Sequence, residues 1–227
     1  MHTLFDPLLL VKEAVKKKML SEEIFSLSVK RMKYIEEAIK KVEKATGVKY
    51  PLWYLAPYAL IMRSSLGETA ILYARNKPII SKDKMMFAVE FTLPLHLYAS
   101  KDTLLAVVAH EFTHYIELAR RINEFEILSS EISTTVFEAS YRDVEEAVKP
   151  ELIFGRYRSI VRLLKERFLD GLSDDALNNK TMKRWIEKGL PTVNISPEEN
   201  VIRIPMKAIL NLKLDEDLIR LLRRIRE

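Results

Sequence analysis

Residues 100–118, SKDTLLAVVAHEFTHYIEL, are the stretch that decides the fold. Ser100 is a suitable N-cap, because its hydroxyl oxygen can accept a hydrogen bond from a free amide of the first helical turn. Asp102 lies in that first turn, where a negative charge suits the helix dipole. Apolar residues then recur at helical spacing: Leu104, Leu105, Val107, Val108, Phe112, Tyr115 and Leu118. The stretch therefore predicts a helix with an apolar face that continues to about Arg121.

Two histidines of this helix, His110 and His114, are four residues apart, and Glu111 lies between them. Residues at this spacing share one helix face, so both imidazoles can reach one metal ion. Zinc binds neutral imidazole nitrogens, and at catalytic sites it lowers the pKa of a bound water. A neighbouring carboxylate can take a proton from that water and pass it to a leaving amine. We therefore predict a Zn²⁺ site with His110 and His114 as ligands and Glu111 as general base.

A third protein ligand is expected, because two histidines alone hold zinc poorly. The chain has no Cys, so the ligand must be a carboxylate or another histidine. The next segment is predicted to be a helix that begins at Ser129 and ends before Pro150, with Glu131 and Glu138 seven residues apart on one face. In a helical hairpin, a wide turn brings Glu138 level with His114, whereas a very tight turn brings Glu131 there. The helix start favours Glu138, and Glu131 remains the alternative.

The remainder of the chain predicts a mixture of helices and short strands. Residues 50–58 are aromatic and interrupted by prolines, which favours a buried connector or, less simply, the lining of a substrate groove. Residues 76–78 are predicted to form a turn, and His96 is expected to be packed rather than a ligand. The other predicted elements are helices over 6–20, 21–46, 156–169, 174–188 and 214–226, and strands over 69–80, 85–93 and 201–205.

Composition bounds the class of protein. The chain has 227 residues and a net charge of +5, from 37 basic and 32 acidic residues that interleave. This pattern favours a solvated surface over a nucleic-acid footprint. The apolar run 8–11 is too short for a signal peptide, and 50–62 is too short to span a bilayer. We therefore expect a cytoplasmic protein without a membrane span or a nucleic-acid partner.

On the residues above, the chain resembles the zincin metallopeptidases of the gluzincin type, from about residue 70 to residue 148. Residues 136–141, VFEASY, are similar to the helix that carries the glutamate ligand in many of these enzymes. Residues 85–93, MMFAVEFTL, are similar to the edge strand that pairs with an extended peptide. The resemblance implies an α+β fold with a zincin-like core: a small antiparallel sheet, the zinc helix and a following glutamate helix, with mostly helical flanking regions. It also implies that a peptide lies along residues 86–91.

We expect one zincin-like domain over residues 1–227, with N-terminal helices in 1–48, the metal-site core in 49–149 and a helical part in 150–227. The expected function is zinc-dependent hydrolysis of peptide bonds in a peptide or protein substrate. A transition-state oxyanion needs a donor besides the metal; Tyr141 is the first candidate, and Tyr115 and His96 are others. One alternative is a zincin-like regulatory or binding protein that keeps zinc but acts on one partner or has lost turnover. The third hypothesis is a helical nucleic-acid binder.

Overall fold

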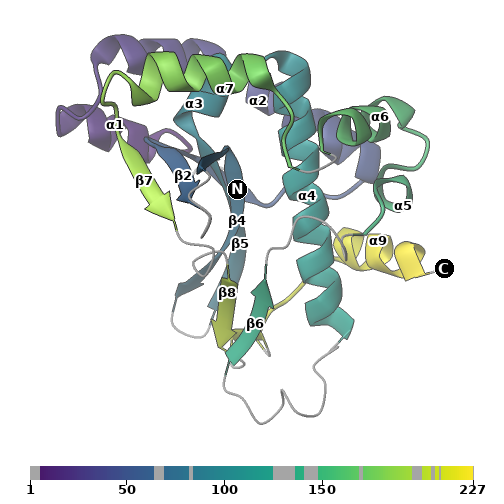
Figure 1. Cartoon of the computed structure of the whole chain (residues 1–227). Coiled ribbons are helices and arrows are strands. Elements are labelled where there is room, and N and C mark those ends of the chain that lie inside the picture. The colour runs from purple at the N-terminus through teal and green to yellow at the C-terminus, as the bar shows by residue number, and fades with distance from the viewer. Residues whose placement is uncertain are drawn as a thin grey trace.

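The computed structural model describes residues 6–63, 69–81, 84–124, 136–140, 148–168, 171–195, 201–205, 208–209 and 211–226 (Figure 1). The fold is α+β, as predicted. Its helices are α1 (Leu9–Lys16), α2 (Glu22–Thr46), α3 (Leu93–Tyr98), α4 (Lys101–Glu124), α5 (Pro150–Phe154), α6 (Arg158–Arg167), α7 (Asp175–Thr181), the π-helical turn η1 (Met182–Ile186) and α9 (Glu216–Arg226). Its strands are β1 (Leu52–Ala56), β2 (Ala59–Arg63), β3 (Thr69–Leu72), β4 (Ala74–Ser81), β5 (Lys84–Thr92), β6 (Val136–Ser140), β7 (Thr192–Ile195) and β8 (Val201–Pro205).

Capping residues set the ends of the two long helices. The Ser21 hydroxyl accepts a hydrogen bond from the Ile24 amide at the start of α2. Gly47 ends that helix in the left-handed region, at φ 74°, where a residue without Cβ meets no steric penalty. At the start of α4 the Ser100 hydroxyl accepts from the Thr103 amide, 3.0 Å away. The predicted cap at the start of this helix is therefore confirmed.

The sheet beside α4 has three strands in the order β1-β5-β4. Strand β5 runs parallel to β1 and antiparallel to β4, so it lies in the middle of the sheet and is paired on both sides. The expectation that residues 86–91 form an edge strand is therefore wrong. Within the part of the chain that the structure describes, β4 forms the edge on one side of this sheet.

Three predicted segments have a different structure. The predicted connector at 50–58 contains β1, because Pro51 and Pro57 fall just outside the strand ends and leave its amides free to pair with β5. The predicted turn at 76–78 lies inside β4, whose edge position tolerates Pro78. Residues 136–140 form β6 instead of a helix, because they pair with β8, more than 60 residues further along the chain.

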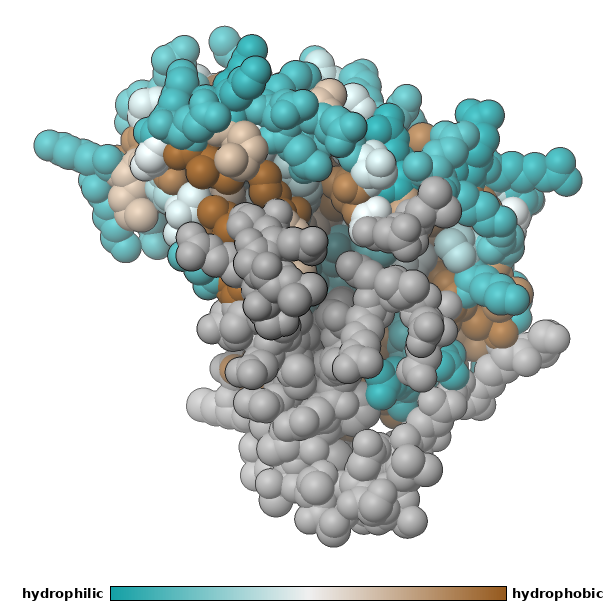
Figure 2. Space-filling model, viewed as in Figure 1, coloured by the Kyte–Doolittle hydropathy of each residue, from teal (hydrophilic) through white to brown (hydrophobic). Residues whose placement is uncertain are grey.

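Helix α4 lies between the strands and the helices α5, α6 and α9 (Figure 1). It packs on α2, on α6 and on β4, and its apolar residues belong to one buried core together with the inner face of the β1-β5-β4 sheet. The terminal helix α9 lies within the helix predicted at 214–226, and it docks through the buried residues Leu218, Leu221 and Leu222. In Figure 2 the helices at the top of the view present mostly hydrophilic residues. None of the helices in the described ranges is both long and apolar enough to cross a bilayer.

Candidate metal centre

The two histidines of α4 meet at their Nε2 atoms. The Nε2 atoms of His110 and His114 are 2.9 Å apart, and their rings are perpendicular, with centroids separated by 4.5 Å. His114 is buried and His110 half-buried. The four-residue spacing, which puts both side chains on one helix face, thus brings two nitrogen donors to a single point, as the sequence predicted.

This donor pair fits a zinc ion. Two nitrogens bound to one tetrahedral zinc ion at about 2.0–2.1 Å are roughly 3.3 Å apart. The observed Nε2 separation of 2.9 Å is a few tenths of an ångström shorter. A small rotation of either ring about its side-chain bonds therefore converts a pair bridged by one proton into a pair that can share one metal.

Glu111 is held on the side of α4 that faces the sheet. Its side chain is buried, and the Nδ2 atom of Asn76, on β4, donates to its Oε2 at 2.7 Å. The same Nδ2 atom donates to the backbone oxygen of Glu111 at 3.0 Å. Asn76 is itself buried, at 3% exposure. The predicted general base is therefore next to the His110–His114 pair, and it is hydrogen-bonded to the edge strand β4.

Sequence reasoning missed Asn76 because Asn-Lys-Pro at 76–78 was interpreted as a turn. Successive side chains of a strand point to opposite faces, so in β4 Asn76 faces the opposite side from Arg75 and Lys77. Arg75, Asn76 and Lys77 are three consecutive polar residues, so no alternation of polar and apolar residues indicates this placement.

Phe168 is the second residue that the sequence did not reveal. It caps the C-terminal end of α6, and its ring stacks on the His110 ring at 3.8 Å between centroids and 5° between planes. The stacking fixes the plane of the imidazole and covers one face of it. No pattern near residue 168 predicts this contact, because it depends on how α6 packs on α4.

This geometry does not decide between Glu138 and Glu131 as the third ligand. Glu138 lies in β6, where it pairs with Arg203 of β8, so the helical-hairpin argument that selected it does not apply. Glu131 and Tyr141 lie outside the described residues. Across the described ranges, no group of three potential ligands surrounds one point. The ligand role of Glu138 and the oxyanion role of Tyr141 stay predictions.

The two other donor candidates are part of the packing. Tyr115 is buried against Phe87 and Phe112, and burial raises the pKa of its hydroxyl above the ordinary value. His96 is fully buried on α3, and its Nε2 lies 2.9 Å from the carbonyl oxygen of Ser28 on α2. The expectation that His96 is a packed residue is confirmed.

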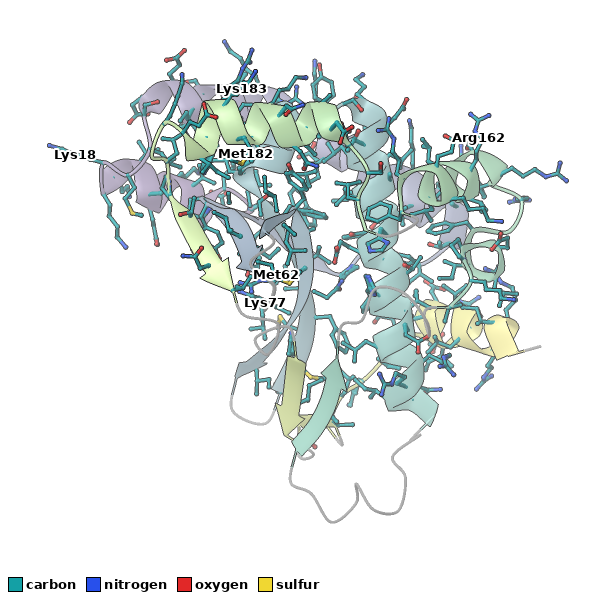
Figure 3. The ribbon with its side chains drawn as sticks, viewed as in Figure 1. Lys18, Met62, Lys77, Arg162, Met182 and Lys183 are labelled. Carbon is teal, nitrogen blue, oxygen red and sulfur yellow. The ribbon has the colours of Figure 1, made fainter. Side chains whose placement is uncertain are left out.

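A second charged cluster lies on the opposite face of the same sheet. The carboxylate of Glu90 on β5 accepts hydrogen bonds from Tyr54 (2.7 Å), Tyr58 (3.1 Å), Arg75 (2.9 Å) and Lys77 (2.8 Å). Desolvation by itself raises the pKa of Glu90, but the charges of Arg75 and Lys77 outweigh it, so this pKa lies below its usual value. In Figure 3, Lys77 lies among the strands, whereas Arg162 extends from α6 into solvent. This cluster anchors β4 to β5.

No family model, curated protein or solved structure matches the chain.

Proposed function

We propose that this chain is a zinc-dependent metallopeptidase with a zincin-like core. The observation that carries the proposal is the convergence of the His110 and His114 Nε2 atoms, 2.9 Å apart, beside the buried carboxylate of Glu111. Two imidazole nitrogens and a neighbouring carboxylate on one helix are the donor set of metal-assisted peptide hydrolysis. The β4 edge next to this group is the second support.

His110 and His114 would hold the metal, with Glu138 or Glu131 as the third ligand. Bound zinc supplies a Lewis acid that makes water more acidic and polarises a carbonyl group. Glu111 accepts the proton of the attacking water and returns it to the leaving amine. Phe168 holds the His110 ring in one plane, so its Nε2 keeps pointing at the same position as His114 Nε2.

The substrate strand belongs on β4. The amide of Thr92 donates to the carbonyl oxygen of Tyr73, 2.9 Å away, which makes this a hydrogen-bonded pair of the antiparallel ladder. Because such pairs alternate, Arg75 and Lys77 pair with β5, while the backbone groups of Asn76 and Pro78 point outward. An extended peptide can therefore add to β4 at Asn76, and it loses one donor at Pro78, which has no N–H.

The test combines metal content with cleavage. We expect about one zinc per chain by elemental analysis of protein purified without a metal-binding tag, and loss of zinc in His114→Ala. Casein and a peptide library are then offered to the zinc-loaded parent, with Glu111→Gln as the control that keeps zinc but loses cleavage. A parent that takes up no zinc refutes the site. A parent that holds zinc tightly and cleaves nothing refutes the peptidase activity and favours a zinc-binding regulatory protein.

A further inference from the structure

We propose that Asn76 is a positioning residue for Glu111, which ties the orientation of the general base to the strand that receives the substrate. This inference rests on the proposed peptidase function. The Asn76 Nδ2 atom lies 2.7 Å from Glu111 Oε2 and 3.0 Å from the Glu111 backbone oxygen. Both of these atoms only accept hydrogen bonds, so the amide must turn its nitrogen towards Glu111. The two acceptors therefore fix the orientation of the Asn76 amide.

The Oδ1 atom of Asn76 adds little to the stability of the fold. Its Oδ1 atom is buried and accepts no hydrogen bond from any described residue. A buried acceptor without a donor disfavours the folded state, and an apolar side chain of the same shape would avoid that penalty. The useful part of the side chain is therefore the Nδ2 group, which contacts Glu111.

Strand β4 holds Asn76 in place from the other face of the sheet. The two neighbours of Asn76, Arg75 and Lys77, project to that face and pair with the buried Glu90 at 2.9 Å and 2.8 Å. The Nδ2 group is thus presented from a strand that is paired with β5 and anchored by two ion pairs. A donor fixed in this way can hold the Glu111 carboxylate in one orientation about its side-chain bonds, whereas a mobile donor cannot.

The side chain of Asn76 contacts one carboxylate oxygen of Glu111, Oε2. The backbone N–H and C=O of Asn76 point to the outer edge of β4, where a peptide would add. The same residue thus pairs with the substrate through its backbone and holds the base through its side chain. Loss of the side-chain contact should therefore slow the chemical step without weakening substrate binding.

The experiment compares the parent, two variants of Asn76 and one control variant on one cleaved peptide, all loaded with zinc. Asn76→Leu keeps the shape and removes the donor, and Asn76→Asp keeps the shape but faces Glu111 with a second carboxylate. We expect kcat to fall about 10- to 100-fold in Asn76→Leu and at least as far in Asn76→Asp, with KM within about twofold and zinc content unchanged. The control is Tyr73→Phe, which removes buried hydrogen bonds to Asn178 and Thr181 from the residue just before β4. Its kcat should stay within about twofold of the parent value.

Two results would overturn the role of Asn76 and leave the peptidase intact: an unchanged kcat in Asn76→Leu, or a higher KM with kcat unchanged. Should Asn76→Leu fail to fold, Asn76→Ser serves in its place, since it shortens the side chain but keeps a donor, and an intermediate kcat is expected. A parent that binds zinc and cleaves no peptide fails at an earlier and separate step. That result overturns the proposed function, and the positioning role with it.

Discussion

Acid should destabilise this protein through His96, well above the pH at which carboxylates are protonated. The Nε2 atom of His96 lies 2.9 Å from the carbonyl oxygen of Ser28, so Nε2 carries the proton of the neutral ring and donates it. The Nδ1 atom is buried and has no hydrogen-bond partner among the described residues. Burial, and secondarily the nearby charge of Arg31, lowers the pKa of His96 to about 4.

The size of the effect follows from the two pKa values. The unfolded chain has the ordinary value of 6.5 and the folded protein about 4, a difference worth about 3 kcal/mol in the free energy of unfolding. Because the folded pKa is the lower one, the unfolded chain binds the proton first as the pH falls. This stability is therefore fully present above about pH 6.5 and is lost between that pH and about pH 4. At pH 5 the loss amounts to about 2 kcal/mol.

The measurement is urea unfolding at pH 7 and pH 5 for the parent and for His96→Gln, whose amide keeps a donor near the position of Nε2. We expect the free energy of unfolding of the parent to fall by about 2 kcal/mol more than that of the variant between these two pH values. His110 and His114 are present in both proteins, so their titration cancels in the comparison. Equal pH dependence in the two proteins would refute the assignment of a low pKa to His96.

Three further predictions concern the sheet, the metal pair and a helix end. Replacement of Glu90 by Gln leaves Arg75 and Lys77 without their buried counter-charge and should lower the free energy of unfolding at pH 7 by about 2 kcal/mol; an unchanged urea midpoint would contradict this. Phe168→Ala removes the ring stacked on His110 and should weaken zinc binding about 10-fold in competition with a chelator, whereas unchanged affinity would show that the stacking does not orient the ligand. Gly47→Ala should lower the free energy of unfolding by about 1 kcal/mol in the same urea assay, because φ is 74° there while an added Cβ meets nothing within 4 Å. If Gly47→Ala were as stable as the parent, the left-handed backbone at residue 47 would not require glycine.

Local sequence patterns were sufficient for both ends of α2, for the start of α4 and for the strands β4 and β5. Ser21 and Gly47 mark the ends of α2, and Ser100 marks the start of α4, because capping depends on residues within one turn. The strands predicted at 69–80 and 85–93 overlap β4 and β5, whose residues pair as antiparallel neighbours. The His110–His114 pair was predictable for the same reason, since both residues belong to one helix.

Contacts between distant segments were not predictable from such patterns. Residues 136–140 are a strand because of β8, and the choice between Glu138 and Glu131 was based on a helix that does not exist over those residues. Asn76 contacts Glu111, which lies 35 positions further along the chain. Phe168 contacts His110 because α6 packs on α4, and no local motif encodes that packing.

Pro78 has a consequence for how copies of this protein behave at high concentration. An open strand edge invites any extended chain, including the same edge of another molecule, and repeated pairing of that kind leads to fibrils. Each incoming copy would meet a proline on β4 that offers no amide hydrogen, one pairing position beyond Asn76. A short peptide that pairs at Asn76 avoids this gap, but a continuous intermolecular ladder cannot. Pro78 thus interrupts pairing along β4, the edge of this sheet in the described residues, and leaves the backbone groups of Asn76 as they are.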